Sequence, residues 1–262
     1  MSGAVFLWKH AGVTTTLIIA ALLSGSFIGA VLGFIGAGGA MITVPILIYI
    51  FDFTPLQATT AALAVVFLTA AAGLIPKFKS KDVLIKEALT IWALGLVTNV
   101  GFGSIAQSLP DTFILIGFSL VLIGAGISML RGPIKDHPEK KISPFYLILL
   151  SLLIGSLTGL FGVGGGFVAI PILVLFFHNS QNKAAGTSLL IITLNCATAF
   201  LAKYQSWELV DWHYPAILAI TGILVAQVAS KFAPNAPTVH LKRGFAYLLF
   251  CLAAFTILTE LL

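Results

Sequence analysis

Apolar runs near the length that crosses a bilayer recur along the whole chain and limit what it can fold into. A hydrocarbon core about 30 Å thick requires roughly 20 consecutive apolar residues in a helix. Hydrophobic residues make up 59% of the 262 residues and charged residues only 9%, against about 25% charged in a typical soluble domain. The mean hydropathy is +1.08. The sequence therefore predicts an all-α, polytopic integral membrane protein without a separate soluble domain.

A glycine-rich phrase that ends in proline occurs twice. "GFIGAGGAMITVP" begins at Gly33 and "GLFGVGGGFVAIP" begins at Gly159. This agreement indicates a duplication, and we expect a first transmembrane repeat over residues 1–131, a cytoplasmic linker over 132–144 and a second transmembrane repeat over 145–262. A shift of 126 residues aligns Gly29, Gly33, Gly36, Gly38, Gly39 and Pro45 with Gly155, Gly159, Gly162, Gly164, Gly165 and Pro171.

Each repeat holds about five apolar segments, and the second segment of each is short. At 1.5 Å per residue, 11 to 14 residues cover only roughly 16 to 21 Å, which predicts re-entrant arms or half-helices. Thr54 and Pro55 form a plausible helix start, and Pro76 stands just past the expected end. The expected segments are 13–35, 40–53, 55–75, 88–107 and 112–130, then 144–161, 167–177, 184–202, 212–230 and 244–261.

Five segments per repeat is an odd number, so the second repeat should be inverted relative to the first. With that topology, 12 of the 14 Lys and Arg residues fall on one side, which the positive-inside rule makes cytoplasmic. We expect a multi-pass protein of the cell inner (plasma) membrane with both termini outside. The N-terminal segment resembles a signal peptide but continues unbroken to Ile35, so we take it as the first membrane helix.

The glycines in the two phrases have different expected roles. Gly25, Gly29 and Gly33 are four residues apart, a spacing that lets membrane helices approach closely. Adjacent glycines such as Gly38 and Gly39 weaken a helix and predict a break. A helix that starts at such a break offers free N–H groups and a positive dipole end to an anion. A purely structural hinge is the alternative, while a dinucleotide-binding loop would need a preceding strand.

Polar residues inside the apolar segments form a second candidate set. Hydroxyl and amide groups can bind an oxyanion without a buried charge, although hydrogen bonding between helices is the alternative. No Asp, Glu, Lys or Arg lies at the centre of a segment, which argues against a dedicated proton relay. The candidate substrate-binding residues are Gly36, Gly38, Gly39, Thr43, Thr59, Thr60, Asn99, Gly162, Gly164, Gly165, Gly166, Thr187, Ser188, Asn195 and Gln227.

No catalytic motif is present, so we expect neither an enzyme nor a cofactor. Cys196 and Cys251 lie in apolar runs and predict neither a disulfide framework nor a metal site. The basic residues lie in short loops, which fits a topology signal and not nucleic-acid binding. The expected partners are a small anionic substrate and the lipid bilayer, and the oligomeric state is open.

The two glycine phrases and the stretches that follow them resemble one family. "GFIGAGGAMITVPIL" precedes "QATTAAL", and "GLFGVGGGFVAIPIL" precedes "KAAGTSLL", a pattern similar to the sulfite-exporter (TauE/SafE) family of bacterial and plant membrane proteins. The resemblance covers nearly the whole chain and implies transport of sulfite, sulfoacetate or other organosulfonates. We therefore expect a secondary transporter, an exporter of such anions working by alternating access. The alternatives are an anion channel on the same scaffold and a non-transporting membrane scaffold protein.

Overall fold

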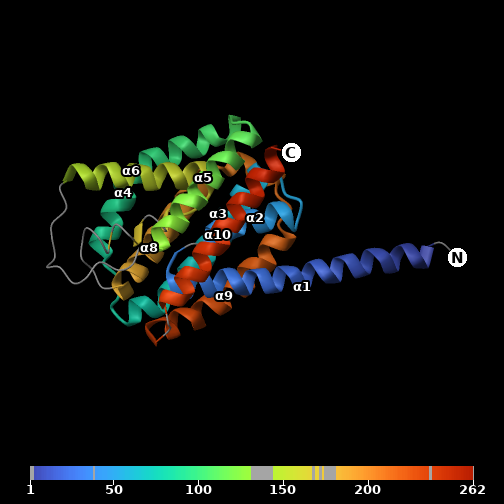
Figure 1. The fold of residues 1–262 in the computed structure, drawn as a ribbon, viewed down its shortest axis with the longest axis horizontal. Helices are drawn as coiled ribbons and strands as arrows, with labels where there is room; N and C mark the ends of the chain where they lie inside the picture. Colours follow the sequence, from blue (N-terminus) through green and yellow to red (C-terminus); the bar gives the residue numbers. More distant parts are fainter. Residues whose placement is uncertain are drawn as a thin grey trace.

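The computed structural model describes residues 3–37, 39–130, 144–166, 169–170, 173, 181–235 and 238–261. Every regular element in these ranges is a helix, as the sequence predicts (Figure 1). The α-helices are α1 (Gly3–Ile35), α2 (Gly39–Tyr49), α3 (Pro55–Lys79), α4 (Ile85–Ile105), α5 (Asp111–Leu130), α6 (Pro144–Phe161), α8 (Gln181–Ala202), α9 (His213–Phe232) and α10 (Thr238–Leu261). Three short 3-10 helices are η1 (Ala106–Ser108), η2 (Tyr204–Leu209) and η3 (Ala233–Asn235).

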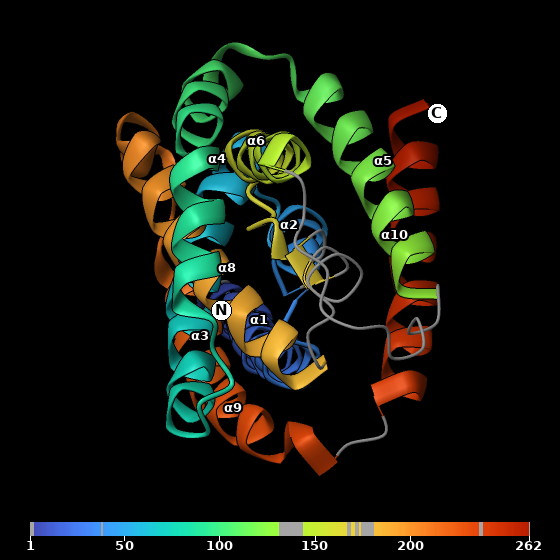
Figure 2. The ribbon, with the colours of Figure 1, turned by 90° about the vertical axis from the view of Figure 1, so that its left-hand side faces the viewer.

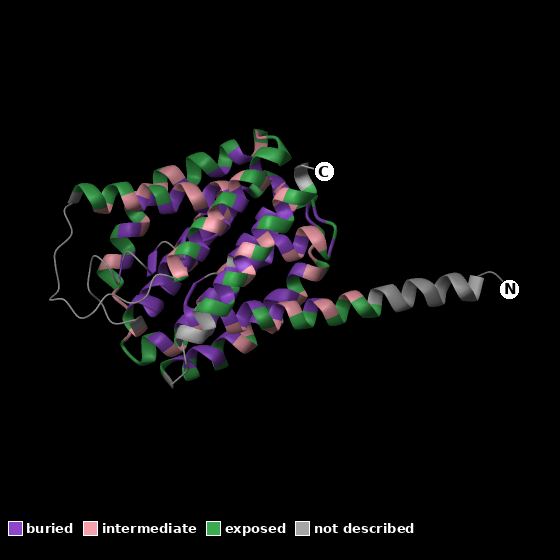
Figure 3. Cartoon of the chain, in the orientation of Figure 1, coloured by how far each residue is buried: buried purple, intermediate pink, exposed green. Residues whose placement is uncertain are grey.

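Six helices in the described residues are long and apolar enough to cross a membrane. Their outer faces carry exposed apolar side chains such as Val97 and Leu224, and Figure 3 shows exposed residues along the outside of the bundle and buried ones within it. This is the surface that lipid contact requires. The candidate spans are Thr15–Ile35, Pro55–Lys79, Ile85–Ser108, Asp111–Leu130, Asn182–Ala202 and His213–Phe232.

The start of α3 confirms the predicted cap. Gln57 N–H donates to Thr54 Oγ1 at 3.4 Å, and Thr54 N–H donates to Gln57 Oε1 at 3.0 Å, with Pro55 as the first helical residue. This reciprocal pair satisfies two backbone donors that a helix start otherwise leaves free.

The end of α3 differs from the prediction. Pro76 lies inside the helix, which continues to Lys79. Proline removes one donor, but the last turn still closes because Ser80 N–H donates to Pro76 O at 3.0 Å. Two starts also differ: α1 begins at Gly3, against the predicted 13, and α10 begins at Thr238, against the predicted 244. The remaining boundaries in the described ranges agree within about four residues. The predicted short arm 167–177 lies outside the described residues except at 169, 170 and 173, and of the predicted linker 132–144 only residue 144 is described.

The two halves of the chain are packed into one another. α1 runs along α9, and α6 runs along α4. A Cβ atom added to Gly29 would lie 2.5 Å from Gly222 O, and one added to Gly155 would overlap Gly95 O. The small residues spaced four apart therefore allow backbone-to-backbone contact, which confirms their predicted packing role.

α3 and α8 form the core of the bundle. They pack against each other in opposite directions, since Gly73 lies near Leu189 while Lys203, just beyond α8, lies near Thr59 at the start of α3. α5 and α10 pack together as a separate pair at one side, and α2 lies between this pair and the other helices (Figure 2).

We predict that Gly95→Ala destabilises the protein by about 1–3 kcal/mol, because the added methyl group would lie 2.5 Å from Ser151 O on α6 and would push the two helices apart. The matched control is Gly101→Ala on the same helix, where an added Cβ meets nothing within 4 Å. That variant should be neutral or slightly stabilising. Thermal unfolding of both proteins in one detergent checks this, and equal melting temperatures would contradict the packing role.

Candidate functional site

The first glycine phrase breaks the chain between two helices, as predicted. α1 ends at Ile35 and α2 begins at Gly39. Gly36 has a φ angle of 75°, a conformation that side-chain-bearing residues rarely adopt. It packs against Ala185 near the start of α8, where a Cβ on Gly36 would lie 2.6 Å from the Ala185 Cβ.

The second phrase breaks the chain in the same way. α6 ends at Phe161, and Gly162, Gly164 and Gly165 have φ angles of 68°, 70° and 67°. Gly162 packs against Thr59 near the start of α3, where an added Cβ would lie 2.7 Å from Thr59 O.

These two contacts correspond to one another. Gly36 and Gly162 are 126 residues apart, and so are Thr59 and Ala185. Each break therefore packs on the third helix of the other half of the chain. Because α3 and α8 are antiparallel, the two breaks lie toward opposite ends of this helix pair.

A buried lysine accompanies each break. Lys203 directly follows α8 and is 0% exposed, and its Nζ donates to Thr59 Oγ1 at 3.3 Å. Lys77 lies in the last turns of α3 and is 2% exposed, and among the described residues its Nζ has no hydrogen-bond partner. A Cβ on Gly186, next to Ala185, would lie 3.3 Å from the Lys77 Cβ.

The sequence analysis missed both lysines because they lie near segment ends. The repeat could have revealed them, because Lys77 and Lys203 are also 126 residues apart and therefore occupy equivalent positions. Both lysines lie near segment ends, as the sequence analysis has it, but the structure buries them.

Two predicted amides form a buried pair between α4 and α8. Asn99 Nδ2 donates to Asn195 O at 3.0 Å and lies 2.8 Å from Thr198 Oγ1. Within the described part of the chain, Asn99 Oδ1 and Asn195 Nδ2 are buried without a partner. Cys196, the neighbour of Asn195, is 3.0 Å from a Cβ placed on Gly164, so the structure brings this pair close to the second break.

The predicted hydroxyls have local roles. Thr43, Thr60 and Thr187 donate to backbone carbonyls four residues earlier, at 2.7–2.8 Å. Thr187 also accepts from Leu84 N–H at 3.0 Å. The bonds to these carbonyls use the hydroxyl proton within the helix. They differ from the hydrogen bonds between helices that the sequence analysis gave as the alternative.

Other predicted residues are spread more widely. Ser188 Oγ donates to Gly166 O at 3.1 Å, which ties α8 to the second break. Gln227 is exposed on α9 and lines a cavity together with Lys77. Gly38 lies outside the described residues.

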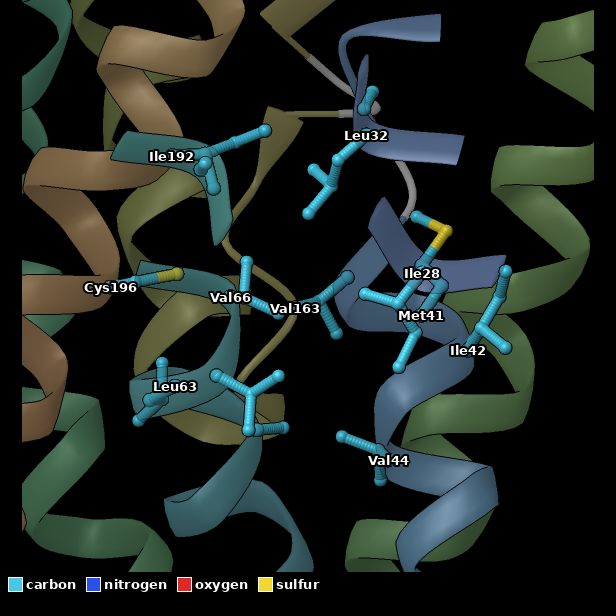
Figure 4. Packing of buried hydrophobic residues seen from close by; sticks show 14 of the residues in the cluster. Ile28, Leu32, Met41, Ile42, Val44, Leu63, Val66, Val163, Ile192 and Cys196 are labelled. Carbon is cyan, nitrogen blue, oxygen red and sulfur yellow. The ribbon is translucent and has the colours of Figure 1, made fainter. Parts of the chain in front are cut away.

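Apolar side chains surround the glycine breaks. Val163, within the second break, lies among Ile28, Met41 and Val66 in Figure 4. An added Cβ on Gly39 would overlap the Leu32 side chain, and one on Gly165 would lie 2.5 Å from Ile154 Cγ2. An anion that reaches the glycines therefore requires these side chains to move.

A cavity of about 660 Å³ lies at the end of the bundle where α3 and α9 finish. Lys77, Lys79 and Lys231 line it together with Ser230 and Gln227. No carboxylate is among its described lining residues, so the cavity is cationic.

A family model described as "Sulfite exporter TauE/SafE" matches residues 21–256. The chain belongs to the TauE/SafE family. The matched region includes both glycine breaks, both buried lysines and the Asn99–Asn195 pair. The resemblance found in the glycine phrases is therefore confirmed.

Relatives of this TauE/SafE protein are named as probable membrane transporters. One from Xylella fastidiosa (strain 9a5c) is 27% identical over 255 residues, which cover 93% of this chain and 96% of that protein. One from Methanocaldococcus jannaschii is 34% identical over 170 residues, covering 61% and 62%. A Bacillus subtilis relative is 26% identical over 217 residues, covering 72% and 79%. The family is one of membrane transporters and not of enzymes.

We predict a pH-dependent stability from Lys203. Burial lowers the pKa of Lys203 to about 8, whereas lysine in an unfolded chain titrates near 10.4. Between these values the unfolded state binds more protons than the folded state, so stability rises with pH by at most about 1.4 kcal/mol per pH unit.

The measurement is the unfolding midpoint from pH 7 to 10 for the native protein and for Lys203→Met. Tyr204 and Glu208 of the adjacent η2 are exposed, and Lys203 forms no ion pair with a described carboxylate. The rise should be clearly smaller in Lys203→Met and persist unchanged in Lys183→Met, a change at an exposed lysine. If stability rises with pH in Lys203→Met as it does in the native protein, titratable groups other than Lys203 cause the rise.

Proposed function

We propose that this protein is a secondary transporter that exports small sulfur-containing anions, such as sulfite, sulfoacetate or another organosulfonate. The observation that carries the proposal is the pairing of each glycine break with a buried lysine: Gly36 with Lys77 at one end of α3 and α8, and Gly162 with Lys203 at the other. The description of the matching family, which names a sulfite exporter, supports a sulfur-containing anion as the substrate.

The chemistry of the interior favours an anion. Lys77 Nζ and Asn195 Nδ2 are buried donors without a partner in the described residues, and lysine offers donors only. An oxyanion accepts hydrogen bonds at every oxygen and compensates the buried positive charge, which an apolar interior otherwise destabilises. α2 begins at Gly39, directly after the first break, and the positive dipole end of a helix start adds to the preference for an anion.

Alternating access follows from an inverted arrangement of the two halves. The contacts of α1 with α9 and of α6 with α4 correspond under the repeat, as do those of Gly36 with Ala185 and of Gly162 with Thr59. Two halves related in this way can exchange conformations, so that the site opens first to one side and then to the other. A single change in the packing between the two halves then closes the site on one side of the membrane and opens it on the other.

The charge pattern gives the proposed direction. The basic loops place the Lys77 end of the bundle in the cytoplasm and both termini outside. An anion that leaves the cytoplasm moves down the membrane potential, worth about 2.3 kcal/mol per charge per 100 mV. Because the membrane potential drives the anion outward, export needs no intramembrane proton relay.

We predict that proteoliposomes containing the native protein release radiolabelled sulfite or sulfoacetate. Gly39→Leu and Gly165→Leu should abolish this flux, since the added side chains overlap Leu32 and Ile154 and lock the breaks in place. Gly124→Leu is the matched control, because a Cβ there meets nothing within 4 Å, and it should retain flux.

The same experiment separates the alternatives. A channel would give conductance that does not saturate at low substrate, whereas a transporter saturates. Absence of flux for sulfite, sulfoacetate and taurine, together with no anion-dependent change in melting temperature, would favour the scaffold alternative. Retained flux in both leucine variants would remove the glycine breaks from the site.

A further inference from the structure

The two buried lysines occupy equivalent positions in the repeat but have different surroundings. Lys203 Nζ has a hydroxyl partner, Thr59 Oγ1. The residue that corresponds to Thr59 near Lys77 is Ala185, which has no hydroxyl. The Lys77 Nζ correspondingly has no hydrogen-bond partner among the described residues. A buried ammonium without a partner is costly, so a ligand that supplies acceptors at this place would be stabilised.

Lys77 also lines the cavity at the ends of α3 and α9. Lys79 and Lys231 add two exposed positive charges to the same cavity. The nearby acid Asp82 accepts a hydrogen bond from Ser80 Oγ at 2.7 Å and makes no ion pair with Lys77 within 4.0 Å. Three lysines therefore line this space, and no carboxylate is among its described lining residues.

We propose that this cavity is an oxyanion-binding site with Lys77 as its central ligand, and that the equivalent position at Lys203 is its closed counterpart. In the described conformation the Lys203 ammonium donates to Thr59, whereas the Lys77 ammonium is buried without a hydrogen-bond partner among the described residues. A sulfite or sulfonate group provides three oxygens for the lysines of the cavity. The assignment of a sulfur oxyanion rests on the proposed export function, whereas the site itself rests on the geometry around Lys77.

The phosphate of an anionic lipid has the same chemistry as a free oxyanion. Ile75 and Val228 line the cavity and are exposed on the outer surface, so the cavity borders the lipid. The test therefore needs a neutral bilayer and an anionic bilayer, to separate a dissolved anion from a lipid headgroup.

The experiment measures the melting temperature of the full-length protein in phosphatidylcholine nanodiscs during a sulfite titration. The native protein should show a saturable rise. Lys77→Gln should weaken the apparent affinity about tenfold, the effect of losing one charged hydrogen-bond partner. Lys86→Gln, the same charge change at an exposed residue outside the cavity, should leave the affinity unchanged. Ala185→Ser places a hydroxyl at the Thr59-equivalent position and should weaken binding a few-fold.

A repeat in phosphatidylglycerol nanodiscs identifies the source of the oxyanion. If the anionic lipid raises the melting temperature through Lys77 and removes the sulfite response, the site holds a lipid phosphate. The proposal is overturned if neither sulfite nor phosphatidylglycerol gives a Lys77-dependent rise, or if Lys86→Gln has the same effect as Lys77→Gln. Lys77-dependent sulfite binding without flux in the native protein would contradict export and leave the site intact. Flux in the native protein without Lys77-dependent sulfite binding would support export and contradict the proposed site.

Discussion

Direct contact between helix backbones at glycine is the constraint on which the rest of the structure depends. The Gly29–Gly222 and Gly95–Gly155 contacts join α1 to α9 and α4 to α6, so the strongest packing lies between the halves of the chain and not within them. In lipid, helices are held by close packing and hydrogen bonds, because apolar side chains gain little by leaving an apolar solvent. The glycine contacts supply that packing and set the positions of α3 and α8 between them.

The central helices then bring together groups that an apolar interior does not favour. Lys203 is held by Thr59, and Asn99 is held by Asn195 and Thr198. Both of these groups, Lys203 and the Asn99–Asn195 pair, lie close to the second glycine break. Buried polar groups that persist in a membrane protein are commonly functional, which is the physical link between the packing of this bundle and its membership of a transporter family.

The asymmetry between equivalent positions is as informative as the repeat. Thr59 carries a hydroxyl group that Ala185 lacks. This difference accompanies a lysine with a hydrogen-bond partner at one end and, within the described residues, a lysine without one at the other. The alternating access that we propose needs the two sides of the protein to differ at any moment. On that proposal, sequence divergence between the halves contributes to the difference together with a change of conformation.

The sequence by itself determined the membrane class, the helix ends near Ile35 and Phe161, and the packing role of the glycines spaced four apart. These features follow from local chemistry: apolar length, backbone conformation at glycine, and the Thr54 cap. Only the tertiary structure decided which side chains face the glycine breaks. In a chain this apolar, both faces of a helix suit either lipid or protein, so periodicity does not mark the inner face. Gln227, predicted inside an apolar segment, is exposed and lines the cavity beside Lys77. Lys77 and Lys203 resemble loop lysines in the sequence but are buried, because helices from the other half of the chain cover them.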